Sequence, residues 1–191
     1  MWYIIYKEIG EQMTYNEMDS YSGKTFNPME ITEDDVCLED IAHSLSLMCR
    51  GSGQILYFYS VAQHSLNCAY EAIARGYDNK HILACLLHDA SEGYIADIIR
   101  PVKQHLKDYD VIENTIMKVI FKKFHLNDID EKLWKVIDNE MLENELKVML
   151  KNHQNDNVPS LKSTPHFQEK NYREVEQEFL FLANQLINGV R

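Results

Sequence analysis

Histidine, aspartate and glutamate side chains gather near the middle of the chain, in the run His88-Asp89-Ala90-Ser91-Glu92. His88 offers a ring nitrogen and Asp89 a carboxylate oxygen, a mixture of donors that divalent transition metals favour. Glu92 follows His88 by four residues and Asp89 by three, so the three would share one face of a helix. Charged groups that converge beside an apolar surface need compensation, which a bound cation supplies. The run therefore predicts a metal site.

A second histidine, His64, precedes this run on a predicted helix over 60–75. The next predicted helix begins near Asn79 after a short turn, so we expect the two helices to pack antiparallel. At a rise of ~1.5 Å per residue, the first helix extends ~17 Å from His64 to Arg75. The second helix returns ~14 Å in the opposite direction, from Asn79 to His88. The two histidines are therefore expected at similar heights on neighbouring helices, where they could share one ligand.

A carboxylate from a third helix would complete such a site. The apolar positions of a predicted helix over 129–151 form one stripe, and Asp138 lies next to that stripe rather than opposite it. Asp128 and Asp130 also precede this helix, so the spacing alone leaves the choice of carboxylate open. A lone buried histidine is more often a core residue than a ligand, so the prediction depends on the whole set of residues.

Helical periodicity dominates the rest of the chain and predicts an all-α fold. Apolar residues at three- and four-residue spacing indicate helices over 39–50, 60–75, 79–88, 109–124, 129–151 and 174–188. Turn residues at Gly23 and Pro28, with loosely alternating apolar residues over 2–9, predict a short irregular or extended N-terminal segment. Residues 152–168 are polar and contain two prolines, so we expect a loop there. One interpretation of this loop is a lid.

The 191 residues are expected to form a single domain, with an N-terminal extension over 1–36, a helical core over 37–151 and a loop and C-terminal helix over 152–191. A net charge of −11 argues against a nucleic-acid polymer as partner. No apolar run reaches the ~18 residues of a membrane span. The N-terminal apolar stretch is too short for a signal peptide. We therefore expect no membrane partner and a cytoplasmic location.

The four cysteines contain no C-x-x-C pair, which argues against a disulfide framework. Cys68 and Cys85 fall inside apolar helical patterns. In such a setting cysteine behaves as a small hydrophobic residue.

The order of these groups resembles that of a known family. His64, then His88-Asp89, then Asp138 on three successive helices is the pattern of the HD-domain metal-dependent phosphohydrolases. The run from His88 to Glu92, followed by Asp97 and Pro101-Val102-Lys103, is similar to the 5′-deoxynucleotidases of that family, which remove phosphate from deoxynucleoside 5′-monophosphates. It is also similar to small phage enzymes that remove triphosphate from deoxynucleotides. The resemblance covers roughly 40–150 and implies an HD-domain helical bundle.

The resemblance also implies a role for eight residues. One divalent ion (manganese, cobalt, zinc, iron or nickel, with magnesium for a triphosphate substrate) would be bound by His64, His88, Asp89 and Asp138. Glu92 would orient or deprotonate the attacking water, and Asp97 would act as general acid or as an outer contact of the metal. Arg50 and Lys103 would bind phosphate, although an ordinary surface position is an equally good interpretation of Lys103. The family commonly has a tryptophan at the position of Gly51, where it distinguishes deoxyribose from ribose. The resemblance therefore does not decide whether this chain selects deoxyribose.

The predicted function is that of a metal-dependent nucleotide phosphohydrolase acting on deoxynucleoside 5′-monophosphates. One metal and few cations suit a small negative charge, because a triphosphate would need more basic residues than Lys24, Arg100, Lys103 and Lys107. The alternatives are a deoxynucleoside triphosphate triphosphohydrolase (dNTPase) and a non-catalytic HD protein that binds a nucleotide as a sensor. The expected partners are a small-molecule nucleotide and further copies of the chain, in a homo-oligomer of two or more subunits.

Overall fold

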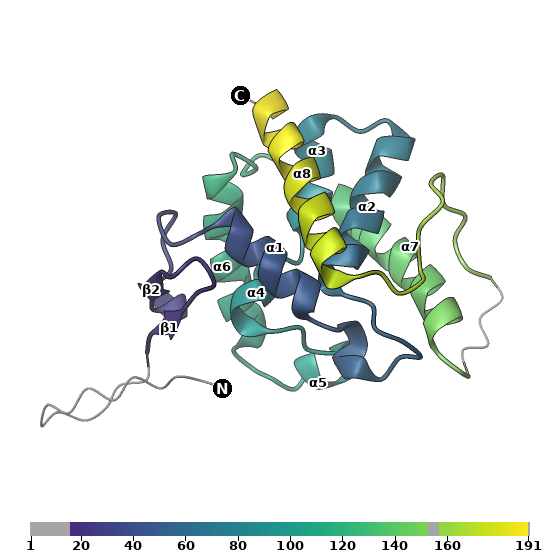
Figure 1. Ribbon diagram of the computed structural model, residues 1–191, viewed down its shortest axis with the longest axis horizontal. Helices are drawn as coiled ribbons and strands as arrows, with labels where there is room; N and C mark the ends of the chain where they lie inside the picture. The colour runs from purple at the N-terminus through teal and green to yellow at the C-terminus, as the bar shows by residue number, and fades with distance from the viewer. Residues whose placement is uncertain (1–15, 153–156, 191) are drawn as a thin grey trace, which may run out of the picture.

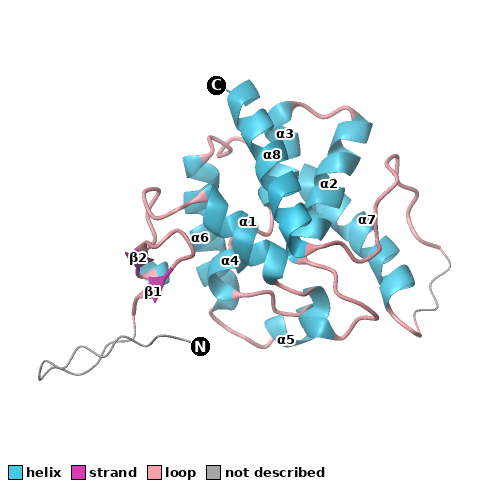
Figure 2. Cartoon of the chain, viewed as in Figure 1, coloured by secondary structure: helices cyan, strands magenta, loops and turns pink. Residues whose placement is uncertain are grey.

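The computed structural model describes residues 16–152 and 157–190, and almost all of its regular structure is helical (Figures 1 and 2). The α-helices of these residues are α1 (Leu38–Leu47), α2 (Val61–Arg75), α3 (Asn79–Leu87), α4 (Glu92–Ile95), α5 (Arg100–Lys103), α6 (Tyr109–Lys123), α7 (Glu131–Met149) and α8 (Tyr172–Val190). Two short 3-10 helices accompany them, η1 (Pro28–Glu30) and η2 (Arg50–Gly53). The all-α prediction is confirmed.

A small hairpin precedes the helices. Strand β1 (Met18–Asp19) pairs antiparallel with β2 (Thr25–Phe26), and Gly23 in the intervening turn has φ +85°, a conformation that glycine adopts without steric cost. Phe26 is buried and packs edge to face against Tyr94, with 5.8 Å between ring centroids. The expected turn at Gly23 is present, whereas the extended stretch expected over 2–9 lies outside the described residues.

Helices α2 and α3 form an antiparallel hairpin at the centre of the fold. The Ser60 hydroxyl caps α2 by accepting from the Gln63 amide, and Asp78 caps α3 by accepting from the His81 amide. Helix α8 packs against α1 and α3, and α7 packs against α2 and α3 (Figure 1). The hairpin is thus enclosed by neighbouring helices, which fixes the height of one of its helices against the other.

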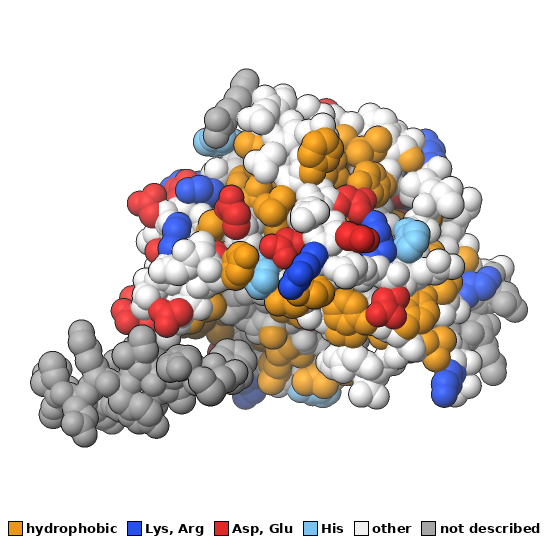
Figure 3. Space-filling model, in the orientation of Figure 1, with side chains coloured by type: hydrophobic (Ala, Val, Ile, Leu, Met, Phe, Trp, Pro, Cys, Tyr) orange, Lys and Arg blue, Asp and Glu red, His pale blue; other side chains and the backbone are white. Residues whose placement is uncertain are grey.

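The hydrophobic core lies around this hairpin and draws on α1, α6, α7 and α8 as well. Its largest fully buried apolar side chains include Ile41, Leu45, Leu83, Leu86, Leu87, Ile116, Ile120, Ile137, Met141 and Phe179. Each such side chain stabilises the fold by about 1.5–3 kcal/mol relative to an exposed one. The outer face shown in Figure 3 mixes apolar side chains with charged ones of both signs. No helix in the described ranges is both long and apolar enough to cross a membrane.

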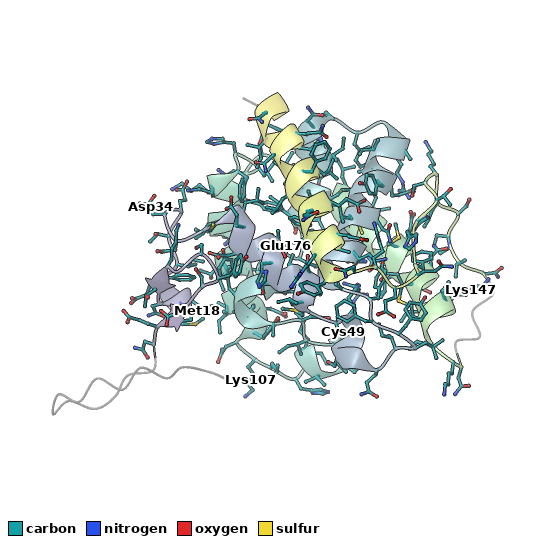
Figure 4. The ribbon with its side chains drawn as sticks, viewed as in Figure 1. Met18, Asp34, Cys49, Lys107, Lys147 and Glu176 are labelled. Atoms are coloured by element: carbon teal, nitrogen blue, oxygen red, sulfur yellow. The ribbon has the colours of Figure 1, made fainter. Side chains whose placement is uncertain are left out.

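Helix α8 is also held to α1 by a polar contact. The His43 ring of α1 stacks on Tyr21, with 3.7 Å between centroids, and its Nδ1 lies 3.2 Å from Glu176 Oε2. Glu176 lies where α8 crosses α1 (Figure 4). His43 therefore has a structural role in the fold.

Helices α1 and α3, which lead to predicted site residues, both end earlier than the periodicity predicts. Helix α1 stops at Leu47, and Arg50 lies in η2 rather than at the end of the first helix. Left-handed backbone at Gly51 and Ser52 interrupts the helical path there. Helix α3 stops at Leu87, and residues 88–91 form turns before α4 begins at Glu92. The expectation that His88, Asp89 and Glu92 share one helix is therefore wrong, because the chain turns between them.

The loop over 157–170, which we name the clamped loop, is fastened to α2. Glu71 is fully buried and accepts hydrogen bonds from the backbone amides of Lys162 and Ser163, at 2.9 and 2.7 Å, and from the Ser163 hydroxyl at 2.6 Å. Arg75 Nε donates to the same carboxylate at 2.8 Å. Burial raises the pKa of Glu71, but these donors outweigh it and lower the pKa to about 2.

Two more side chains of α2 hold the same loop, at the four-residue spacing of one helix face. Gln63 Nε2 donates to the carbonyls of His166 and Gln168, at 3.0 and 2.8 Å. Asn67 accepts from the His166 amide at 3.2 Å and donates to its carbonyl at 3.1 Å. Instead of moving freely, the loop is bound at its backbone by buried polar groups, so it is a fixed part of the wall around α2.

The Glu71 clamp predicts an acid-dependent loss of stability. Glu71 keeps its charge in the folded protein down to a pH of about 2, whereas an unfolded glutamate titrates near pH 4.3. The stabilisation is therefore present above pH ~4.3 and is lost as the pH falls toward ~2. Glu71→Gln should lower the free energy of unfolding at neutral pH by about 1–3 kcal/mol, because the amide cannot accept from all these donors.

Urea denaturation of the variant and the wild type at several pH values measures this difference. The exposed Glu169, at the end of the same loop, supplies a matched control in Glu169→Gln. Equal stability of Glu71→Gln and wild type at neutral pH would contradict the clamp.

Candidate metal centre

Two buried imidazoles face each other across the central hairpin. His64 of α2 and His88, directly after α3, have their Nε2 atoms 3.3 Å apart, and both rings are almost fully buried. His88 Nδ1 donates to the Cys85 carbonyl at 2.7 Å. In the neutral ring that bond leaves Nε2 free to bind a metal. The predicted similarity in height of the two histidines is thus present in the structure.

Two carboxylates approach the same pair of nitrogens. Asp89 Oδ2 lies 3.3 Å from His88 Nε2 and 3.8 Å from His64 Nε2. Asp138 Oδ1, from α7, lies 3.2 Å from His64 Nε2 and 3.7 Å from His88 Nε2. The structure therefore brings together the four residues that the sequence singles out as metal ligands, from three different parts of the chain.

Cys68 belongs to the same cluster. Its Sγ lies 3.6 Å from His64 Nε2, and His64, Cys68 and His88 offer ligand atoms that all lie within 4.8 Å of one another. This buried group could hold a metal ion. Sequence reasoning placed Cys68 in the core and missed its position at the site. The available signal was its spacing, four residues after His64, which puts both side chains on one face of α2.

The carboxylates control the charge of the two histidines. Burial and the Arg50 guanidinium lower the pKa of His64, but Glu145 and Asp138 outweigh them and raise it above its ordinary value. Burial likewise lowers the pKa of His88, which Asp89 and Asp138 raise well above the ordinary value. Without a metal, both rings are thus drawn toward the imidazolium form by the surrounding negative charge.

The carboxylates respond in the opposite direction. Burial raises the pKa of Asp89, but His88 and His64 lower it to about 2, and the same histidines lower the pKa of Asp138 despite its burial. Two anions with two imidazole nitrogens form a donor set that fits a divalent cation, whose two positive charges can replace those of the two imidazolium rings. The chemistry of the residues present therefore fits a metal ion.

Glu145 supports the centre from behind and was not singled out as a functional residue by the sequence. It is buried on α7, and its Oε1 accepts from His64 Nδ1 at 2.7 Å and from the Tyr59 hydroxyl at 2.9 Å. Burial raises the pKa of Glu145, but His64 and Arg50 outweigh burial and keep it below its ordinary value. A carboxylate on the far nitrogen of a ligating histidine fixes the ring and makes it a better donor.

Arg50 lies behind the centre as well. Its Nη1 is 3.4 Å from Asp89 Oδ2, and its Nε is 3.3 Å from Glu145 Oε2. Burial lowers the pKa of Arg50, but Glu145 and Asp89 raise it, so the guanidinium stays charged. Its neighbour Cys49 lies at the start of the segment that follows α1 (Figure 4). The predicted phosphate ligand is therefore next to the centre but already bound to two carboxylates.

Glu92 and Asp97 lie close enough to Asp89 for its charge to act on both carboxyls. Glu92 is buried, and within the described residues its Oε2 has no hydrogen-bond partner. Burial, followed by the charges of Asp89 and Asp97, raises the pKa of Glu92 well above its ordinary value. Burial also raises the pKa of Asp97, although Arg50 opposes it and the Gly51 backbone donates to its carboxylate. Both predicted catalytic carboxyls thus share the electrostatic field of the centre.

The two other basic residues of the region differ in their surroundings. Lys103 Nζ lies 2.5 Å from Glu113 Oε2 and 5.0 Å from the Tyr109 ring centroid. In the described part of the chain it forms no ion pair with the four predicted metal ligands. Arg100, which the sequence offers only as a reserve cation, has Nη2 3.5 Å from Asp138 Oδ2. The structure thus places Arg100, rather than Lys103, at the centre.

An aromatic ring completes the surroundings of His88. The Trp134 ring of α7 lies 5.6 Å from the His88 ring, centroid to centroid, one helical turn before Asp138. Its buried Nε1 has no hydrogen-bond partner among the described residues. Because only two tryptophans are present in the chain, the fluorescence of Trp134 offers a signal for events at His88.

Comparison with known proteins gives relatives but no activity. No protein-family model matches the sequence. The chain is 40% identical over 107 residues to "Uncharacterized protein YfdR" of Escherichia coli (strain K12), covering 56% of this chain and 57% of the relative. It is 38% identical over 111 residues to "Uncharacterized protein RCAP_rcc00048" of Rhodobacter capsulatus, covering 55% and 56% respectively. The chain thus matches little more than half the length of these relatives, and function must be argued from the site.

The geometry predicts which substitutions remove a bound metal. His88→Ala should abolish stoichiometric binding of zinc or cobalt, because it deletes a central nitrogen donor. Cys68→Ala should retain the metal, because His64, His88, Asp89 and Asp138 still supply four donors. Elemental analysis of reconstituted, dialysed protein measures both outcomes.

His81→Ala is the matched control, since His81 lies on α3, the helix that leads to His88, but pairs with Asp78 at the helix start. Circular dichroism shows whether each variant keeps its helices. Full metal content in folded His88→Ala would contradict the site. Loss of the metal from folded Cys68→Ala would show that sulfur, and not only the carboxylates, completes it.

Proposed function

We propose that this protein is a metal-dependent phosphohydrolase of the HD type that cleaves deoxynucleoside 5′-monophosphates to a nucleoside and inorganic phosphate. The observation that carries this proposal is the convergence of His64, His88, Asp89 and Asp138 on one small volume. The resemblance of the motif to the HD nucleotidases gives the reaction class. The electrostatics of the site and the positions of Glu92 and Asp97 support it.

A divalent ion held by His64, His88, Asp89 and Asp138 would supply a Lewis acid for the phosphate and lower the pKa of a bound water. The chain prepares these ligands in advance. Glu145 and the Cys85 carbonyl hold the Nδ1 atoms of the two histidines, so that both Nε2 atoms point at the same place. Arg50 restrains the Asp89 carboxylate. Little reorganisation is then needed when the ion and the substrate bind.

Glu92 is proposed to orient the attacking water and accept its proton. Burial and the charges of Asp89 and Asp97 raise its pKa, so its ionised carboxylate is a stronger base than an ordinary one. Its partnerless oxygen has a free place for such a hydrogen bond. Asp97, with a raised pKa of its own, is proposed to donate a proton to the leaving oxygen of the sugar.

Arg50 can still contact phosphate while it holds the two carboxylates. Its ion pairs with Asp89 and Glu145 use Nη1 and Nε, and among the described residues Nη2 forms no ion pair. We propose that Nη2 stabilises an equatorial phosphate oxygen as negative charge develops there. Because two carboxylates already share this guanidinium, its capacity for further anions is small. This supports a substrate with one phosphate over a triphosphate.

The role of Glu92 predicts a separation between metal binding and turnover. Glu92→Gln should keep the metal but lose about 10²- to 10⁴-fold in kcat, the usual contribution of general acid–base catalysis. Elemental analysis and phosphate release, measured on the same preparation, test both parts. Glu174→Gln, an exposed residue of α8, is the control. Wild-type turnover by metal-loaded Glu92→Gln would remove Glu92 from the mechanism.

The substrate class is decided by the products. Metal-reconstituted protein should release inorganic phosphate from deoxynucleoside 5′-monophosphates and leave triphosphates intact. Chromatographic separation of the products from a panel of deoxynucleoside mono- and triphosphates measures this. Inorganic triphosphate as product would show a dNTPase instead. The absence of cleavage with every divalent metal tested would favour a nucleotide-binding sensor.

A further inference from the structure

We propose that Arg100 binds the phosphate of the substrate from the solvent side of the metal centre. This inference rests on the proposed function, since it assigns the substrate's phosphate to a residue at the same site. It follows from the different partners of the two Asp138 carboxylate oxygens. It also follows from the ion pairs that the basic residues around the centre form.

The two oxygens of Asp138 face different partners. Oδ1 lies 3.2 Å from His64 Nε2, on the inner side of the centre. Oδ2 lies 3.5 Å from Arg100 Nη2, so the guanidinium is on the outer side of the same carboxylate. Because the Arg100 side chain is 65% exposed, it approaches this carboxylate from solvent, the side from which a phosphate would enter the centre. Arg100 is therefore within reach of an anion that occupies the centre.

The exposure of Arg100 sets it apart from Arg50 and Lys103, the two predicted phosphate ligands. Its side chain is 65% exposed, against 15% for Arg50 and 26% for Lys103. Arg50 is committed to Asp89 and Glu145, and Lys103 is committed to Glu113. Arg100 reaches the centre from solvent and has room to turn from Asp138 to a ligand. It is the basic residue best placed to receive an incoming anion.

The backbone that precedes Arg100 is held in place, although the Arg100 side chain is exposed. Ala96 has φ 77° and ψ 152°, a conformation that costs a non-glycine residue roughly 1–3 kcal/mol. The Tyr109 hydroxyl donates to the Ala96 carbonyl at 2.6 Å, which stabilises this turn. Arg100 also donates to Asn139 Oδ1 at 3.0 Å, beside Asp138 on α7. The Arg100 guanidinium is thus held by Asp138 and Asn139, and the backbone that leads to it is held at Ala96.

The charge of the centre explains how Arg100 could change partner. Without a metal, the Asp138 carboxylate attracts the guanidinium. A divalent cation at Oδ1 would neutralise part of this negative charge and weaken the attraction. A phosphate dianion then becomes the stronger partner, and the planar guanidinium can bind two of its oxygens at once. The ligand class is a phosphate monoester, and an uncharged nucleoside would lack this contact.

Inorganic phosphate is a suitable probe because its binding can be measured whether or not the protein hydrolyses nucleotides. Isothermal titration of phosphate into zinc-loaded protein should give about ten-fold or more weaker binding for Arg100→Ala, the loss expected for a charge-assisted contact. Arg100→Lys should recover part of the affinity. The zinc content of every variant is measured in parallel, so that a lost metal is not mistaken for a lost anion contact.

Lys135→Ala is the matched control. Lys135 precedes Asp138 by three residues on α7, is half exposed and pairs with Glu131, so its removal changes the net charge nearby by the same amount. It should leave phosphate affinity within about two-fold, because screened surface charges contribute little.

The outcomes separate this inference from the proposed function. Unchanged phosphate affinity in zinc-loaded Arg100→Ala, or no phosphate binding by the wild type, would overturn the role of Arg100. A greater loss in Lys103→Ala than in Arg100→Ala would also overturn it. If Arg100→Ala weakens phosphate binding but the wild type cleaves no nucleotide, Arg100 keeps its role and the phosphohydrolase proposal fails.

Discussion

The buried carboxylate of Glu145 is the constraint on which the candidate site depends. A carboxylate removed from water costs several kcal/mol unless charged and polar partners surround it. Here those partners are His64, Tyr59 and Arg50, which come from α2 and from the segment between α1 and α2. Each partner is thereby fixed relative to α7, which also carries Asp138. Asn67 donates to the Tyr59 hydroxyl at 2.8 Å and also to the His166 carbonyl of the clamped loop. The same hydrogen-bond network therefore extends from the metal centre to that loop.

The charge balance of the centre gives a physical reason for a cation. Asp89, Asp138 and Glu145 carry three negative charges in a mostly buried volume. Arg50 supplies one positive charge there, while water largely screens the charge of the exposed Arg100. Two protonated histidines would supply the remainder, which agrees with their raised pKa values. A divalent ion supplies the same two charges and leaves the imidazoles neutral, as ligation requires. The site is therefore balanced either by two protons or by one metal ion.

The sequence predicted the parts of the protein that depend on periodicity. The helices and the similar heights of His64 and His88 follow from apolar spacing and helical rise, which tertiary contacts did not override. The role of Glu145 could not be read in this way, because a buried carboxylate on an amphipathic helix has the same spacing as a solvated one. Its position seven residues after Asp138 was the only signal. The same limit applies to the polar residues of α2 that bind the clamped loop, Gln63, Asn67 and Glu71.

The breaks between helices matter as much as the helices themselves. Because α1 ends at Leu47 and α4 ends at Ile95, the chain can turn after each helix and bring Arg50 and Asp97 to the surroundings of Asp89. Two non-glycine residues with positive φ, Ser52 at 53° and Ala96 at 77°, redirect the two segments, and the Gly51 backbone donates to the Asp97 carboxylate. Backbone strain of this kind persists only where the surrounding structure holds it. Strain at both turns beside the candidate centre thus points to the same place as the charges do.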